Sequence, residues 1–201
     1  VSGSDVVFTG SGRVIDLSNV DVNLANLSAT ATQEDAYIGI TDGELSGKIT
    51  LGVLGEGLDI YSLESSYKSL TVKSGAVLTV ADGVTIGGVQ TGAGLSVSSG
   101  GKLIAGAAQL QLGTSRLDVS GEAELTGTTI VSTNSEPVRI YNGGKLTMSG
   151  CDVSGCSPML VHGGGTAQLN DMTVRRICMD GEVSLQAVSV SELLYISGGT
   201  V

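Results

Sequence analysis

Residues 144–153 read GKLTMSGCDV and residues 165–174 read GTAQLNDMTV, and in both stretches apolar residues stand two, four, seven and nine places after a glycine. Two further stretches repeat this spacing, GEAELTGTTI at 121–130 and GEVSLQAVSV at 181–190. Fifteen of the sixteen residues at these offsets are apolar, and Thr128 is the exception. The residues expected to face an interior are Ala123, Leu125, Thr128, Ile130, Leu146, Met148, Cys151, Val153, Ala167, Leu169, Met172, Val174, Val183, Leu185, Val188 and Val190.

Each of the four stretches is predicted to contain two short strands, because apolar residues two positions apart are typical of a strand that buries one face. A corner of two residues, TG, SG, ND or QA, separates the strands and shifts the alternation by one. The second strand can face the same interior only if the chain bends at this corner. A third apolar pair usually precedes the glycine, and these pairs are Leu117/Val119, Val138/Ile140, Leu160/His162 and Leu194/Ile196.

The difference in length between the repeats is concentrated in one connection. The glycines at positions 121, 144, 165, 181 and 199 follow one another in unequal steps, and the difference lies in the loop that follows the second strand. A surface loop of variable length is tolerated, since each doubling of its length costs only ~0.6 kcal/mol of closure entropy. The sequence therefore predicts an all-β fold, a single-stranded parallel β-helix in which each coil has three short strands.

One solenoid domain is expected over residues 1–201, with less regular coils in 1–69 and regular coils in 70–201. Upstream, Ile15, Leu17, Val20 and Val22 repeat the offsets, and Val84 and Ile86 follow after one extra corner residue. A sandwich of antiparallel hairpins is the competing fold. It would show NG or DG turns at regular spacing, whereas the GG pairs here precede strands of the same phase. A left-handed hexapeptide helix would need a strict six-residue rhythm, which the sequence lacks.

The composition excludes several classes of protein. Glycine makes up 31 of the 201 residues, proline only 2, and 41% of the chain is apolar, which argues against disorder. A formal charge of -10 disfavours nucleic acid as a partner. No apolar run is long enough to span a bilayer, so direct membrane insertion is not expected. The start lacks an initiator Met and the features of a signal peptide, so a mature or trimmed chain is expected.

Four segments carry a resemblance to a known family. VSSGGKL (97–103), IYNGGKLTMSG (140–150), VHGGGTAQL (161–169) and YISGGTV (195–201) resemble the V-x-x-GG-x-L units of bacterial autotransporter passengers and adhesin-like surface proteins. The resemblance extends from about Leu70 onward. It implies a right-handed β-helix, secretion or display at the bacterial surface, and often adhesion to a host or bacterial glycan or protein. The three cysteines are a departure, because such passengers generally lack cysteine.

Three cysteines cannot all pair within one chain, and the sequence has neither a C-x-x-C motif nor a Cys/His cluster that would indicate zinc. Cys151 has the offset of Met172 and Val188, so it is expected to be a buried apolar residue. Cys156 and Cys178 are both predicted to lie in the variable corner of successive coils. The sequence leaves open a disulfide between them or two free thiols, and free thiols are the simpler interpretation.

The only histidine, His162, is expected to lie near Asp180 of the next coil. Such a pair can act as an acid–base couple, although a structural hydrogen bond at a turn is the more ordinary interpretation. Without a nucleophile or a second base beside them, no catalytic mechanism can be assembled.

Some right-handed β-helices are polysaccharide lyases or glycoside hydrolases, so a carbohydrate-active enzyme of pectin-lyase-like fold is the alternative function. Such a site needs several carboxylates, or carboxylates with Arg or Lys, in one groove. The nearest approach is Asp152 and Asp171 with Arg175 and Arg176, but the two aspartates have different offsets and are expected on different parts of the coil. A solvated charged edge explains these four residues equally well.

The GG pairs match neither a phosphate-binding loop nor a calcium β-roll, because the G-K-[ST] and G-x-D continuations are missing. Tight corners explain these glycines more simply. Five tyrosines, which more often cap the edge of a core than contact a ligand, are scattered along the chain at Tyr37, Tyr61, Tyr67, Tyr141 and Tyr195.

The sequence therefore predicts an adhesin-like or structural β-helix of a secreted or surface-anchored bacterial protein, with no catalytic, cofactor-binding or metal-binding residues and no cofactor. YISGGTV begins a new coil, in which Val201 has the offset of Leu146. The chain is accordingly expected to be a fragment of a longer protein, or to have this edge covered by a partner. Self-association through open coil edges is the related expectation.

Overall fold

The structure is a computed structural model of the chain. It describes the backbone of residues 6–8, 12–17, 22–31, 36–40, 43–53, 59–62, 69–80, 82–83, 85–88 and 94–201, and the side chains of residues 71–80, 82–83, 86 and 94–201. The described residues form twenty strands and no helix. No helix capable of crossing a bilayer therefore occurs in this part of the chain.

The strands are short in the middle of the chain and long at its end. Their bounds are β1 (Val6–Phe8), β2 (Gly12–Leu17), β3 (Val22–Ala31), β4 (Ala36–Ile40), β5 (Gly43–Val53), β6 (Asp59–Ser62), β7 (Ser69–Val72), β8 (Val77–Val80), β9 (Thr85–Gly88), β10 (Gly94–Val97), β11 (Lys102–Ala105), β12 (Gln109–Gly113), β13 (Leu117–Val119), β14 (Glu122–Thr126), β15 (Thr129–Ser132), β16 (Val138–Ile140), β17 (Lys145–Ser149), β18 (Met159–Val161), β19 (Thr166–Met179) and β20 (Glu182–Ile196).

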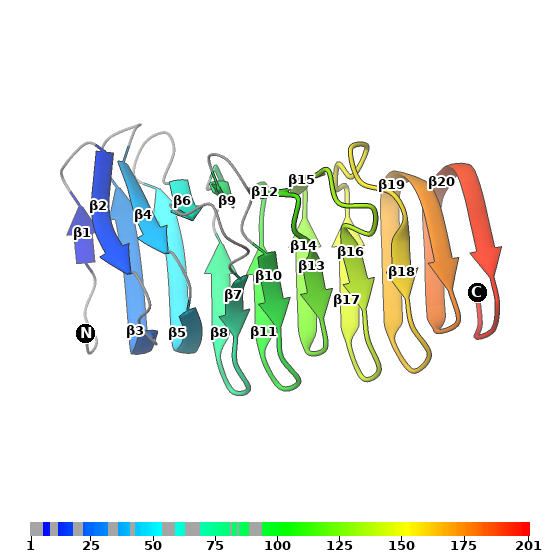
Figure 1. The fold of residues 1–201 in the computed structure, drawn as a ribbon, viewed down its shortest axis with the longest axis horizontal. Coiled ribbons are helices and arrows are strands. Elements are labelled where there is room, and N and C mark those ends of the chain that lie inside the picture. The colour runs from blue at the N-terminus through cyan, green and yellow to red at the C-terminus, as the bar shows by residue number, and fades with distance from the viewer. Residues whose placement is uncertain are drawn as a thin grey trace.

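The described strands pair in parallel with strands of neighbouring coils, so the chain stacks as a β-solenoid along its long axis (Figure 1). From β7 onward the pairings run in three ladders. The first ladder is β8–β11–β14–β17–β19. The second is β9–β12–β15. The third is β7–β10–β13–β16–β18 and continues into the end of β19.

The pairing register confirms the predicted coil lengths. Residues 122, 145, 166, 182 and 200 are successive partners, and each lies directly after one of the glycines that mark the repeats. The extra length of the longer coils lies between β15 and β16 and between Val153 and β18, where loops were expected. In the two shortest coils this loop is absent, and β19 and β20 run as single strands of 14 and 15 residues. The predicted parallel β-helix is thus confirmed and the antiparallel sandwich excluded, while the handedness of the coil stays a prediction.

The core is the column of residues that the spacing places inward. Of the sixteen expected residues, thirteen are at most 6% exposed, and only Leu185, Val188 and Val190 of the last coil are half-buried. Thr128 is tolerated inside because its Oγ1 donates to the carbonyl oxygen of Gly106 at 2.7 Å. Upstream, Ile86 is buried as expected, whereas the side chains of Ile15, Leu17, Val20, Val22 and Val84 lie outside the described residues.

Each two-residue corner contains one residue in the left-handed conformation, and this residue reorients the strand that follows. The second position of the corner has a positive φ in all four repeats: Gly127 at 63°, Gly150 at 61°, Asp171 at 51° and Ala187 at 53°. One left-handed residue interrupts the pleat, so the strand that follows turns its apolar residues back to the same interior. The bend that the shifted alternation required is therefore present.

The two glycines of a GG pair are required for different physical reasons, as Gly143 and Gly144 illustrate. Gly143 has a φ of 79°, and Gly144 closes the turn by donating its N–H to the carbonyl oxygen of Tyr141 at 2.9 Å. A side chain on Gly144 would collide with the carbonyl oxygen of Val119 in the preceding coil. The first glycine therefore supplies a backbone conformation, and the second permits the coils to approach.

One predicted pair is wrong by one residue. Leu160 and His162 were expected inward, but Met159 and Val161 are the buried residues, at 3% and 1% exposure. Met159 pairs with Val138 and Val161 with Ile140, so the partners in the preceding coil fix the alternation. The consecutive apolar residues of β18 fit either alternation, which is why the sequence alone did not decide it.

Candidate functional site

The outward face of the third ladder brings together five of the candidate residues, Tyr141, His162, Cys178, Asp180 and Tyr195. Its middle column follows the register Ser96, Asp118, Arg139, Leu160, Cys178, Tyr195. Two residues further along each strand lies a second outward column, Ser98, Ser120, Tyr141, His162, Asp180, Ser197, whose backbone continues the ladder hydrogen bonds. We call this surface the third-ladder face.

The earlier half of the third-ladder face carries charges that are already paired. Asp118 accepts a hydrogen bond from the Tyr141 hydroxyl at 3.2 Å and lies 3.4 Å from Nε of Arg116. Arg139 donates from Nη1 to the Tyr141 hydroxyl at 3.4 Å and forms an ion pair with Glu136. These groups hold one another in place.

His162 marks the change from this network to a hollow. Its ring stacks on Tyr141 of the preceding coil, with the ring centroids 5.2 Å apart and the planes 12° from parallel. Its Nε2 atom is buried and has no hydrogen-bond partner within the described part of the chain. Nε of Arg139 and Oγ of Ser157 are likewise buried without a partner, and each such atom costs free energy.

The hollow beside His162 has a volume of about 200 Å³. Its walls come from β18 and from the two coils that follow, and none comes from the coil of Tyr141. We call it the His162 pocket, and its lining residues are Leu160, Val161, His162, Cys178, Met179, Asp180, Tyr195 and Ser197. Sequence reasoning missed Leu160 as a neighbour of His162 because the one-residue error in β18 assigned it to the interior. It missed Cys178 because a variable corner was expected at that residue, and it assigned Tyr195 to no face.

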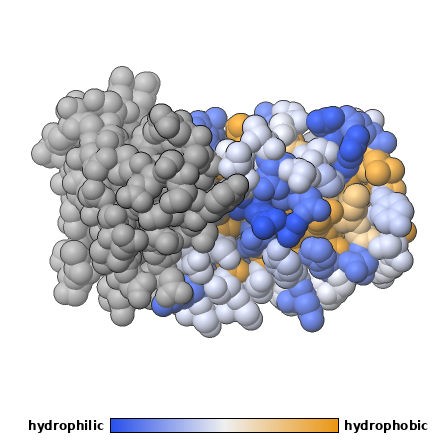
Figure 2. All heavy atoms as spheres, viewed as in Figure 1, coloured by the Kyte–Doolittle hydropathy of each residue, from blue (hydrophilic) through white to orange (hydrophobic). Residues whose placement is uncertain are grey.

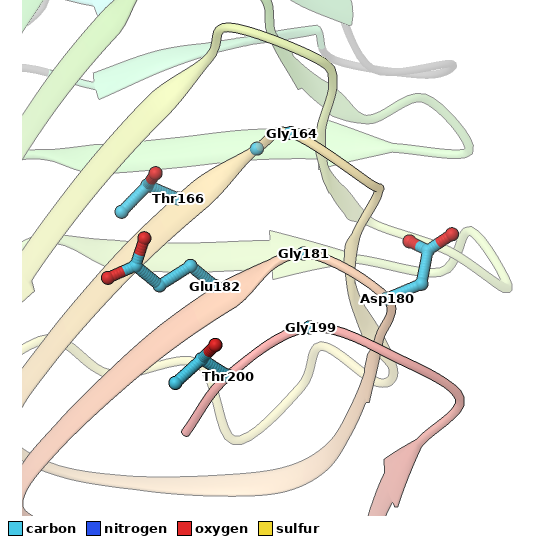
Figure 3. Close-up of a pocket in the computed structure, with 8 residues that line it drawn as sticks. Gly164, Thr166, Asp180, Gly181, Glu182, Gly199 and Thr200 are labelled. Carbon is cyan, nitrogen blue, oxygen red and sulfur yellow. The ribbon is translucent and has the colours of Figure 1, made fainter.

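A second depression lies at the glycine corner around Gly181 (Figure 3). It measures about 240 Å³ and includes two carboxylates, Asp180 and Glu182, among residues that are mostly glycine and threonine. The two side chains project away from each other, on opposite sides of the corner (Figure 3). They therefore do not face a common point in this depression.

The expected proximity of His162 and Asp180 is confirmed, since both line the His162 pocket. In the described residues, however, no hydrogen bond joins the two side chains. The Asp180 carboxylate instead lies beside Gly163, with its Oδ2 3.6 Å from where a Cβ on that glycine would be. Asp180 forms no ion pair with any described residue, so its carboxylate is available to a ligand.

The cysteines are all free, and only Cys178 lies in a different place from the expected one. Cys151 is buried as predicted, and burial raises the pKa of its thiol. Cys156 is buried in the loop before β18, where its Sγ donates to the carbonyl oxygen of Ile130 at 3.2 Å. Cys178 does not lie in the variable corner, because β19 continues through it, and it faces outward between Leu160 and Tyr195. A disulfide between Cys156 and Cys178 is absent.

The aspartates and arginines considered for an enzyme are separated. Asp152 pairs with Thr129 and Thr173 in the second ladder, and its pKa is lowered because its carboxylate accepts the Ser154 N–H at 2.9 Å. Asp171 occupies the left-handed corner. No hydrogen bond or ion pair within the described residues joins either aspartate to an arginine.

Arg175 and Arg176 both bind Glu192 of the following coil instead. Their Nε atoms donate to its two carboxylate oxygens at 2.7 and 2.8 Å. These hydrogen bonds, from Arg175 first and then Arg176, lower the pKa of Glu192. Sequence reasoning missed Glu192, because its distance from the arginines depends on the register of the last coil, which was not assigned at this corner.

Of the five tyrosines, Tyr141 and Tyr195 lie on the third-ladder face, and Tyr195 is 55% exposed. The side chains of Tyr37, Tyr61 and Tyr67 lie outside the described residues. Within the residues whose side chains are described, no group of three His, Cys, Asp or Glu is arranged to hold a metal ion.

Comparisons with protein families, with curated proteins and with solved structures found no match for this chain. The assignment of a function therefore depends on the geometry of the solenoid and its faces.

Proposed function

We propose that the chain is a secreted or cell-surface β-helix of adhesin-like or structural type, right-handed in its coil, which binds or displays rather than catalyses. The observation that carries the proposal is the third-ladder face. Stacked parallel strands repeat its outward side chains at the strand spacing of ~4.8 Å, which makes a flat, extended surface on a rigid support. Such a surface suits recognition of an extended partner.

The setting supports the same proposal. An acidic solenoid with a formal charge of -10 stays soluble and repels phosphate-rich polymers, which favours a glycan or a protein as the partner. The V-x-x-GG-x-L units resemble those of rods displayed at bacterial surfaces. Localisation outside the cell is part of the proposal.

The alternative is a carbohydrate-active enzyme. One observation keeps it under consideration, because the glycine-corner depression has two carboxylates in its lining. Glycoside hydrolases place two carboxyl groups on either side of one bond, at roughly 5–9.5 Å from each other. The opposed directions of Asp180 and Glu182 favour the binding function over this one (Figure 3).

A glycan and protein array tested with the whole chain distinguishes these functions, when combined with lyase and hydrolase assays on the glycans that bind. Binding without turnover is the expected result. Turnover of any bound glycan would overturn the proposal in favour of the enzyme. Absence of binding to glycans, proteins and bacterial or host cells would leave only a display role.

A further inference from the structure

We propose that the His162 pocket binds one neutral sugar ring of a larger glycan. The inference rests on the proposed binding function and assigns it a site and a class of ligand. It follows from three properties of the pocket: an aromatic ring at one wall, unpartnered polar atoms, and a negative local charge.

The first property is the incomplete stack of rings. The second outward column of the third-ladder face places Tyr141 and His162 in successive coils, with their rings in parallel contact at 5.2 Å. The next two coils supply Asp180 and Ser197 at this column, which have no ring. Because the pocket walls come from β18 and these later coils, the pocket lies on the side of His162 away from Tyr141.

A sugar ring fits this position by its chemistry. One face of a hexose ring presents C–H groups, which pack against an aromatic or imidazole face, while its edge presents hydroxyl groups. The remaining wall offers Leu160 and the 55% exposed ring of Tyr195 for the apolar part. Apolar walls with a few convergent polar groups are the usual composition of a ligand site.

The second property is the presence of polar atoms without partners. The Asp180 carboxylate lines the pocket and forms no ion pair or side-chain hydrogen bond with the described residues. Ser197 donates its hydroxyl to the carbonyl oxygen of Met179 at 3.2 Å, so its oxygen still has a lone pair to offer. Hydroxyl groups of a sugar both donate and accept, so they can bind the Asp180 carboxylate and the Ser197 oxygen.

The third property is charge, which selects among sugars. Asp180 is the only acidic side chain in the pocket lining. The nearest arginines along the chain are engaged, Arg176 by Glu192 and Arg139 by Glu136. No Lys or Arg lines the pocket to bind a carboxylate or sulfate, and an anionic sugar is repelled by Asp180. A neutral hexose ring is the occupant that this charge favours.

The size of the pocket limits it to one ring. A volume of about 200 Å³ is below the ~300–1,000 Å³ that enclose a whole small-molecule ligand. Single-ring binding of this kind is weak, with an expected dissociation constant of about 1 mM, which corresponds to a binding free energy of about −4 kcal/mol. Additional rings of an oligosaccharide would lie along the third-ladder face.

The test is a two-dimensional amide NMR titration of the whole chain. The neutral probes are maltohexaose, cellohexaose, mannohexaose and the hexamer of N-acetylglucosamine, and the anionic probe is hexagalacturonate. At least one neutral probe is expected to shift the amides of residues 160–162, 178–180 and 195–197 at millimolar concentration. Hexagalacturonate is expected to shift them at least fivefold less.

Variants then locate the ring. Asp180→Asn and Tyr195→Ser should weaken binding of that neutral probe at least fivefold, because one alters the acceptor and the other removes the aromatic wall. Glu182→Gln is the matched control, since it removes an exposed carboxylate two residues away and outside the His162 pocket. Its affinity should stay within twofold of the parent chain.

Several outcomes would overturn the inference. If the probes shift amides elsewhere, or if Asp180→Asn and Tyr195→Ser bind like the parent, the glycan site is another surface and the proposed function stands. If hexagalacturonate binds as tightly as the neutral probes, the argument from charge is wrong. If no probe binds while the array detects a protein partner, the pocket has no sugar site, and the binding function is unaffected.

Discussion

Gly121 illustrates what the stacking of coils demands of a single residue. A Cβ at this position would collide with the carbonyl oxygens of Ser98 and Gly101 in the preceding coil. We expect Gly121→Ala to lower the free energy of unfolding by about 2–3 kcal/mol, because the backbone of two coils must move apart. Chemical denaturation followed by circular dichroism measures this change.

Gly155 provides the matched control, because a Cβ there would meet no atom within 4 Å and its φ is not positive. Gly155→Ala should change the free energy of unfolding by no more than about 0.5 kcal/mol. Equal destabilisation by the two substitutions would contradict the steric explanation. The glycines would then be needed for the flexibility of the chain rather than for the close approach of the coils.

The buried thiol of Cys156 makes the free energy of unfolding depend on pH. Burial first, with a smaller contribution from Asp152, raises the pKa of its thiol from 9.0 to about 11. Between these values the unfolded chain loses the proton while the folded chain keeps it, so the folded state is destabilised as the pH rises. We expect the free energy of unfolding to fall more steeply from pH 9 to pH 11 in the parent chain than in Cys156→Ala.

The control for this prediction is Cys178→Ser, which changes the outward cysteine and should keep the steep dependence of the parent. Urea denaturation at several pH values measures all three proteins, and Cys151 contributes equally to each. Parallel curves for the parent and Cys156→Ala would contradict the assigned burial of the thiol.

Predictions for single residues were correct where the same position of the repeat could be compared in several coils. Cys151 shares its column with Met172 and Val188, and its burial was predicted correctly. Cys178 had no such equivalent, since its place depended on whether a loop follows Val174. The shortest coils omit that loop, and a side chain expected at a corner instead faces outward on a strand.

At the scale of an element, the two-residue corner is the feature that can be tested most directly. Gly150 and Ala187 occupy the same left-handed position in different coils. A Cβ on Gly150 would meet nothing within 4 Å, so only the backbone conformation opposes a side chain there. Left-handed geometry costs an L-residue about 1–2 kcal/mol.

The exchange of these residues should therefore act in opposite directions. Gly150→Ala is expected to lower the free energy of unfolding by about 1 kcal/mol, and Ala187→Gly to raise it by about 0.5 kcal/mol after the greater chain entropy of glycine is included. Thermal unfolding detects shifts of this size. A loss of stability in Ala187→Gly would mean that its methyl group makes a compensating contact.

Strand assignment from the sequence depended on how clearly apolar and polar residues alternate. β14 and β17 alternate cleanly, and their inward residues were predicted without error. β18 contains three consecutive apolar residues, so its facing is decided by the partners Val138 and Ile140 of the preceding coil. A local pattern does not contain this information. The sequence alone therefore could not place Leu160 in the His162 pocket.

At the scale of the whole molecule, the solenoid exposes its interior at the end formed by β20. Figure 2 shows apolar residues gathered at this end of the molecule. Leu194 and Ile196 continue core columns of the third ladder, yet they are 38% and 49% exposed because no described strand covers them. The repeat made this open edge predictable, since every coil needs a neighbour to bury its apolar face.

Such an edge should drive self-association of this chain. We expect its sedimentation coefficient to rise with protein concentration, and to rise more in high salt, because salt screens the repulsion between acidic copies. Ile196→Lys should keep the chain monomeric, since it places a charge among the uncovered apolar residues. Gln168→Lys, on the exposed outer face of the first ladder, is the control that adds the same charge and should associate like the parent.

The two substitutions separate the edge from the net charge. If association depends mainly on overall repulsion, both lysines reduce the acidity equally and both should promote it. If the uncovered columns of β20 are responsible, only Ile196→Lys abolishes it. A parent chain that stays monomeric over a hundredfold range of concentration would contradict the prediction, because the exposed apolar residues would then be insufficient to overcome the repulsion of acidic copies.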